Sequence, residues 1–71
     1  MKAKDLKVGE YIIIYGPVWC REWLLVGKGQ FIVCKVLKTK GKTVTCCLTQ
    51  AEDIVLEIDD DKYKIQSAKG S

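Results

Sequence analysis

Lysines are the residues best suited to chemistry in this 71-residue chain. Lys28 stands between Gly27 and Gly29, and flanking glycines allow a tight turn that exposes the ammonium group. Such a lysine can approach a phosphate as a point charge, although a glycine–lysine–glycine stretch is also typical of a simple turn. Residues 27–51 contain five lysines and no acid, which makes these lysines the candidate nucleic-acid-binding set: Lys28, Lys35, Lys38, Lys40 and Lys42.

No catalytic constellation is present in the sequence. There is no histidine, and the first serine is Ser67, so no nucleophile is paired with a base. The acids of residues 52–61 include Asp59, Asp60 and Asp61, which lack the alternating ligands and distal glutamate of an EF-hand loop. This triplet indicates a solvated turn. We therefore expect a non-enzymatic domain without a metal or cofactor.

The four cysteines, Cys20, Cys34, Cys46 and Cys47, do not follow the paired spacing of zinc ligands. A disulfide framework requires a secretory context, and the N-terminal residues lack the apolar segment of a signal peptide. Cysteines within apolar runs behave as small buried hydrophobes, so we favour packing over a disulfide or redox chemistry. No apolar run approaches the roughly 18 residues that cross a bilayer, so we expect a cytoplasmic protein without membrane contact.

Short strands must position these side chains within a single domain, residues 1–71. Tyr11–Tyr15 is continuously apolar and predicts a strand covered on both faces. The clearest element is a hairpin, in which 31–38 and 43–48 alternate and Gly41 occupies the left-handed position of the loop. Ile54–Ile58 predicts a further strand. The expected core consists of Ile32, Cys34, Val36, Val44, Cys46, Leu48, Ile54, Leu56 and Ile58.

The remaining segments are less regular. Residues 18–26 favour an irregular strand pair or a long loop, although Trp19, Trp23 and Val26 also fit a helical spacing. Thr49–Glu52 has the spacing of a capping box and predicts a single helical or 3₁₀ turn. A final short strand contains Tyr63 and Ile65, and the tail is expected to fray from about residue 66.

About five short strands with little helix predict an all-β fold that is mostly antiparallel. Closure into a small barrel would remove the exposed edges of such a sheet. A long first loop followed by a meander resembles the plan of a five-stranded SH3-like barrel. An OB-fold is the neighbouring alternative, but it needs more residues and a helix between its strands.

Two short motifs, "LKVGEYIIIYG" and "GKGQ", resemble the first, KOW-like domain of the elongation factor P family over residues 6–48. The resemblance implies an SH3-like barrel and an RNA-facing loop at Lys28, in a translation-related setting. In that family the loop lysine is modified and reaches the ribosomal peptidyl-transferase centre. Here Val26 replaces the usual proline and the following OB-type domains are missing, so we do not carry the modification over.

Two functions remain open. The first is binding of RNA or a ribonucleoprotein through the five lysines, with Phe31 on the same strand face as Lys35. The second is a protein–protein interaction module, such as an accessory or phage-encoded regulator, which binds a protein or peptide through Trp19, Trp23 and Tyr15. Core packing is the alternative for the tryptophans, and at least one is expected in the core. The sequence ranks the RNA hypothesis first.

Overall fold

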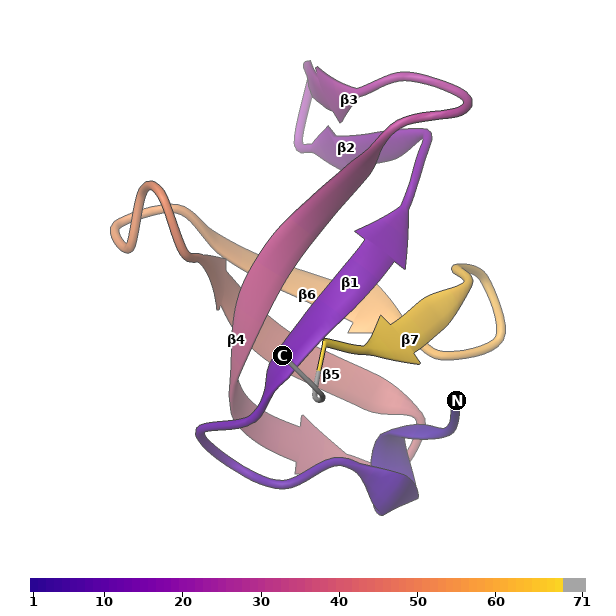
Figure 1. Ribbon diagram of the computed structural model, residues 1–71, viewed down its shortest axis with the longest axis vertical. Helices are drawn as coiled ribbons and strands as arrows, with labels where there is room; N and C mark the ends of the chain where they lie inside the picture. Colours follow the sequence, from indigo (N-terminus) through magenta and orange to yellow (C-terminus); the bar gives the residue numbers. More distant parts are fainter. Residues whose placement is uncertain (69–71) are drawn as a thin grey trace.

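Seven strands and one 3₁₀ turn make up residues 1–68, the part of the chain that the computed structural model describes (Figure 1). Gly and Pro residues separate the early elements, and alternating apolar side chains run through the later ones. The elements are η1 (Ala3–Asp5), β1 (Tyr11–Tyr15), β2 (Val18–Cys20), β3 (Trp23–Val26), β4 (Phe31–Lys40), β5 (Thr43–Leu48), β6 (Val55–Asp59) and β7 (Ile65–Ser67).

The strands form a five-stranded antiparallel sheet in the order β6-β5-β4-β1-β7 and a separate β2–β3 ladder. This confirms the predicted all-β, antiparallel class. Figure 1 shows the small ladder above the end of β1 and the start of β4. Within residues 1–68 no backbone ladder joins the two outer strands, β6 and β7. No helix in this part of the chain is long and apolar enough to cross a membrane.

The predicted core is largely confirmed. Strand side chains alternate between two faces, and the inner face of each strand carries the apolar set. Of the predicted residues, six are buried, namely Cys34, Val36, Val44, Cys46, Leu56 and Ile58. The other three, Ile32, Leu48 and Ile54, are half-buried and pack against them. The core also includes residues outside the predicted list, namely Ala3, Leu6, Ile12, Ile14, Val18 and Ile65.

The expectation that β1 is covered on both faces is wrong. Ile12 and Ile14 point into the core, but Tyr11 on the opposite face is 51% exposed. Ile13 and Tyr15 on that same face are only half-buried. A continuous apolar run therefore does not distinguish a doubly covered strand from one whose outer face carries aromatic residues.

The β4–β5 hairpin is confirmed, with two differences in detail. Strand β4 extends to Lys40, so the turn is reduced to Gly41 and Lys42, and Gly41 has φ +60° as expected for the left-handed position. The ladder also shifts register between Val36 and Lys38, which leaves Leu37 as a partly exposed bulge residue. This bulge lets β4 bend along the sheet.

The helical turn predicted at Thr49–Glu52 is wrong. The Thr49 hydroxyl donates to the carbonyl of Val33 at 3.2 Å instead of capping a helix, and Thr49 and Gln50 form a bend. A neighbouring strand thus supplies the acceptor. At the other end, the β7 ladder includes Gln66 and Ser67, within the stretch where fraying was expected. The last residues of the predicted frayed tail, 69–71, lie outside the described residues.

Candidate interaction surfaces

The β2–β3 hairpin exposes both tryptophans. Trp19 is 52% exposed and Trp23 is 76% exposed. The expectation that at least one of them belongs to the core is therefore wrong. Val18, which is fully buried, fills the core position of β2 and leaves the neighbouring Trp19 on the outside. Residues 18–26 adopt the predicted strand pair, closed by Arg21 and Glu22.

The two tryptophans lie on opposite faces of this hairpin. Trp19 pairs with Leu24, whereas Trp23 pairs with Cys20. Directly paired residues share a face and successive residues alternate, so Trp19 and Leu24 form one face and Cys20 and Trp23 the other. Arg21 adopts φ +57°, a conformation that costs energy for a residue with a side chain. The strained residue lies in this turn, two positions before Trp23.

Trp23 lines a concave depression between the hairpin and the start of β6. This depression, which we call the hairpin groove, has a volume of about 440 Å³. Apolar side chains line most of it, and Arg21 and Asp53 supply a positive and a negative charge. The complete lining is Cys20, Arg21, Trp23, Leu25, Asp53, Ile54 and Val55. Sequence reasoning singled out Trp23 but missed Ile54 and Val55 as its neighbours, because only the fold brings residues 53–55 to the hairpin.

Tyr15, the third predicted protein-binding residue, lies on a different surface. Its ring centroid is 6.0 Å from that of Phe31, its cross-strand partner on β4. The Lys64 ammonium lies 5.4 Å from the centroid of the Tyr15 ring, within the range of a cation–π contact. The Tyr15 hydroxyl donates to Oε1 of Gln66 at 2.9 Å. We use the name outer aromatic face for the surface formed by Tyr15, Phe31, Lys64, Gln66 and Lys35.

The five predicted lysines do not form one patch. Lys35, Lys38 and Lys40 lie along the outer side of β4, with Lys35 opposite Tyr11 in the ladder. Lys28 lies in the turn before β4, separated from Lys40 by about 30 Å of strand at the usual rise per residue. Lys28 and Lys40 therefore lie at opposite ends of β4.

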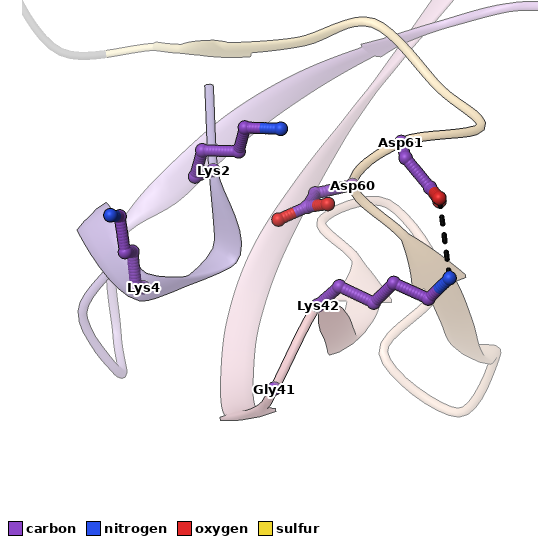
Figure 2. A pocket seen from close by; sticks show the side chains of 6 residues that line it. All are labelled: Lys2, Lys4, Gly41, Lys42, Asp60 and Asp61. Atoms are coloured by element: carbon purple, nitrogen blue, oxygen red, sulfur yellow. Dashed lines mark hydrogen bonds and ion pairs between the residues drawn. The ribbon is translucent and has the colours of Figure 1, made fainter.

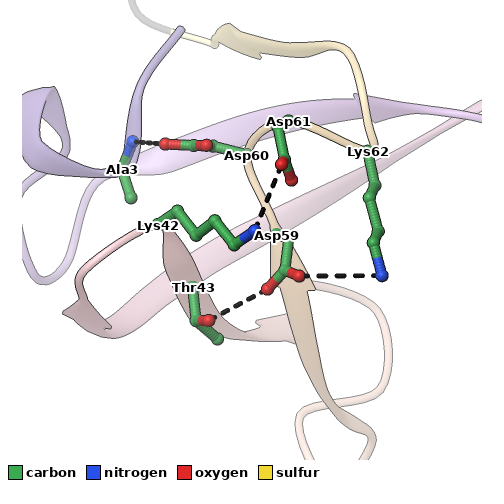
Figure 3. Close-up of polar contacts among 7 residues, drawn as sticks. All are labelled: Ala3, Lys42, Thr43, Asp59, Asp60, Asp61 and Lys62. Carbon is green, nitrogen blue, oxygen red and sulfur yellow. Dashed lines mark hydrogen bonds and ion pairs between the residues drawn. The ribbon is translucent and has the colours of Figure 1, made fainter.

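The acidic run folds against the tip of the basic hairpin and neutralises part of it (Figure 3). The Lys42 ammonium lies 3.2 Å from Oδ2 of Asp61, and the Asp60 N–H donates to the Lys42 carbonyl at 2.8 Å. The hydrogen bond from the Lys42 ammonium to the Asp61 carboxylate raises the pKa of Lys42 and lowers the pKa of Asp61. Asp59 accepts a hydrogen bond from the Thr43 hydroxyl at 2.9 Å. Lys42 is therefore already paired.

Two further lysines reach this end of the molecule. Lys2 and Lys4, on the N-terminal turn, line a depression with Gly41, Lys42, Asp60 and Asp61 (Figure 2). Neither Lys2 nor Lys4 belongs to an ion pair within residues 1–68. Sequence reasoning missed them because nothing local links the N-terminus to the hairpin tip. Asp60 makes that link by accepting the Ala3 N–H at 2.7 Å.

The buried cysteines pack against each other. A hydrogen bond with Cys46 and burial both raise the pKa of Cys34 far above its ordinary value, so its thiol stays protonated at neutral pH. Cys47 is also buried, and Cys20 is half-buried at the hairpin groove. In the described part of the chain, no group of three or more His, Cys, Asp or Glu side chains could hold a metal ion.

Comparisons with protein-family models, with curated proteins and with solved structures give no match for this chain.

Proposed function

We propose that this domain is a non-enzymatic protein-interaction module that binds its partner at the hairpin groove. The exposure of Trp23 beside a concave apolar surface supports this proposal most strongly. Tryptophan is enriched among the residues that dominate binding energy, because its large ring is buried in a pocket of the partner or covered by it. The groove adds a recess for an apolar side chain of the partner, with Arg21 and Asp53 available to polar groups at its rim.

The distribution of charge ranks this hypothesis above RNA binding, which reverses the order expected from sequence. Lys42 is paired with Asp61, and Lys28 lies at the far end of β4 from Lys40. The acids of β6 and its flanking turns lie beside both the tip of the β4–β5 hairpin and the hairpin groove. A nucleic acid approaching either place would meet carboxylates.

Selection of peptides from a random displayed library tests the proposal. Peptides enriched on the wild-type domain should lose binding to Trp23→Ala by about tenfold or more, as expected when a dominant interface residue is truncated. Trp19→Ala is the matched control, because it removes the same side chain from the opposite face of the hairpin. Enriched peptides that bind Trp23→Ala as well as wild type would contradict the proposal.

RNA or ribonucleoprotein binding at the outer aromatic face is the second candidate. Tyr15 and Phe31, which is 55% exposed, offer rings on which bases can stack, with Lys64 and Lys35 beside them. This candidate surface differs from the one expected from the sequence, because it relies on aromatic rings and on lysines away from the tip of the β4–β5 hairpin. Lys28 and Lys42 have no part in it.

We also propose that the sheet is an SH3-like barrel related to the first domain of the elongation factor P family. The long excursion between β1 and β4, the β4–β5–β6 meander and the return of β7 beside β1 support this proposal. A chemical-shift assignment with cross-strand contacts between the β6 and β7 ends of the sheet would test whether the barrel is closed. Their absence in solution would favour an open sheet.

A further inference from the structure

Strand β6 pairs with β5 along one edge, and within residues 1–68 no strand pairs with its other edge, which we call the free edge. Only every second residue of an antiparallel strand is hydrogen-bonded to a given neighbour. The Leu48 N–H donates to the Ile54 carbonyl and the Asp60 N–H donates to the Lys42 carbonyl, so the even-numbered residues of this stretch face β5. In an antiparallel ladder, the residues between such pairs turn their N–H and C=O groups away from the neighbouring strand. Val55 and Glu57 therefore direct both backbone groups toward the free edge. Within residues 1–68 no backbone hydrogen bond outside the β5 ladder reaches either residue.

The side chains along this edge indicate what could pair with it. Val55, Glu57 and Asp59 lie on the outer face, where they pair with Cys47, Thr45 and Thr43. Val55 is 48% exposed and Glu57 is exposed without an ion pair within residues 1–68. An added strand would place side chains directly opposite these two, and opposite charges in that position stabilise a sheet. The edge is therefore complementary to a strand carrying a basic residue and, two residues away, an apolar one.

The hairpin groove begins where β6 begins. Ile54 and Val55 line it together with Trp23. A strand running antiparallel to β6 passes Glu57 first and Val55 second, and it reaches the groove at Val55. One extended segment can thus use the backbone edge and the apolar recess together, in the mode known as β-augmentation.

We propose that an extended basic segment of a partner protein binds as an additional antiparallel strand on β6. Its basic side chain lies opposite Glu57, and its apolar side chain lies opposite Val55 and enters the hairpin groove. This inference rests on the proposed function and adds the class of partner. A second copy of the chain is a poor occupant, because antiparallel pairing of two β6 edges would bring Glu57 and Asp59 of both copies together. RNA is a poor occupant because the same acids repel phosphate.

A designed probe tests the inference with the full chain. The probe is a synthetic peptide, acetyl-Thr-Lys-Val-Lys-Thr-Leu-Thr-Thr-amide. Its binding is measured by the tryptophan fluorescence and the amide chemical shifts of the protein. Binding should shift the amides of Val55 and Glu57 and protect the Glu57 N–H from exchange. N-methylation of the second lysine and the leucine of the probe should weaken binding about tenfold or more, since it removes both donors to the edge.

Two variants of Glu57 separate the backbone contribution from the charge. Glu57→Pro removes the carboxylate together with an N–H that points to the free edge and leaves the β5 ladder intact, so it should weaken binding about tenfold or more, and its excess over Glu57→Gln measures the backbone contribution. Glu57→Gln retains the N–H and removes only the charge, so its loss should be smaller and should vanish at high salt. A probe with glutamate in place of lysine should bind more weakly than the lysine probe.

Each alternative result has a defined meaning. The inference is overturned if the probe does not bind, if the N-methylated probe binds as tightly, or if an oligouridine rather than the peptide shifts Val55 and Glu57. If N-methylation has no effect but Trp23→Ala abolishes binding, the groove remains the binding site and the edge does not. If N-methylation weakens binding while Trp23→Ala has no effect, the edge stands and the groove proposal fails.

Discussion

Trp23 pairs directly with Cys20 across the β2–β3 ladder, and both side chains line the hairpin groove. The half-buried thiol of Cys20 is thus a natural reporter for whatever occupies the groove. The other cysteines are buried, and Cys34 is also held in its protonated form by the hydrogen bond with Cys46 and by burial.

Iodoacetamide should therefore alkylate Cys20 first in the folded protein. A cysteine reacts readily only as a thiolate and only where the reagent can reach it. Cys34 and Cys46 should react only in denaturant. Mass spectrometry of the intact chain and of its peptides measures this order. A groove-binding peptide should slow the labelling of Cys20. Labelling of Cys34 at the same rate as Cys20 would contradict the packing described here.

Gly16 should tolerate no side chain, because a Cβ there would collide with the carbonyl oxygen of Gly27. These two residues bring together the two ends of the excursion that contains the β2–β3 hairpin, and the Gly16 N–H donates to the Gln30 carbonyl at 2.8 Å. Gly16→Ala should lower the free energy of unfolding by about 1–3 kcal/mol, as expected for overpacking. Gly27→Ala is the control, since its Cβ would meet its nearest neighbour at 3.5 Å, an ordinary contact. Equal urea midpoints for the two variants would refute this prediction.

Asp60 connects the N-terminal turn to the β6–β7 turn through its bond to the Ala3 N–H. Asp60→Ala should cost about 1–2 kcal/mol of stability, because a charge-assisted hydrogen bond is lost at a partly buried site. Asp60→Asn retains an acceptor and should cost less. Thermal or urea unfolding measures both, and a loss for the asparagine variant as large as that for alanine would show that the charge, rather than the hydrogen bond, is what matters.

The Lys42–Asp61 pair should make a small, pH-dependent contribution. The pKa of Asp61 is lowered in the folded state, so its contribution is present above the unfolded pKa and is lost as the pH falls through the folded pKa. The pKa of Lys42 is raised, so its contribution is lost only as the pH rises through the folded value. Asp61→Asn should therefore have a lower urea midpoint than wild type near neutral pH. In strong acid the two midpoints should be equal. Added salt should shrink the neutral-pH difference, since both groups are exposed.

RNA binding at the outer aromatic face makes a separate prediction. Affinity for a single-stranded oligouridine should fall with salt, and Lys35→Ala should reduce the log–log slope by about 0.7, the contribution of one phosphate contact. Phe31→Ala should weaken binding about tenfold, the lower part of the range for loss of a stacked base. Lys42→Ala is the control, because Lys42 is already paired with Asp61. Anisotropy titrations that detect no binding at low salt would remove this candidate.

Local patterns in the sequence were enough to predict the β4–β5 hairpin and most of the core. Alternation over residues 31–38 and 43–48 and a glycine at position 41 act within the hairpin itself. The exposure of Trp19 and Trp23 could not be predicted, because it depends on Val18 rather than a tryptophan reaching the core. A non-local acceptor similarly overrode the capping box at Thr49.

The candidate site was less predictable than the fold for the same reason. Trp23 could be named from its type, but Ile54 and Val55 join it only through tertiary structure. The separation of basic and acidic runs in the sequence suggested two separate surfaces. In the folded chain they meet, because the β6–β7 turn lies against the β4–β5 turn and places Asp61 on Lys42.

Strands β1 and β4 are antiparallel neighbours whose last pair is Tyr15 and Phe31, and a short turn would be enough to connect them. Residues 17–29 are inserted at that point as an excursion with its own ladder. Apart from Val18, its strands add no fully buried side chain to the interior. Mutation can therefore remodel the tip of this excursion without disturbing the register of the five-stranded sheet, so the partner preference of such a domain can diverge faster than its scaffold. The same arrangement makes the exposed residues 21–24 the natural place to graft or randomise sequence when the domain is used as an engineering scaffold.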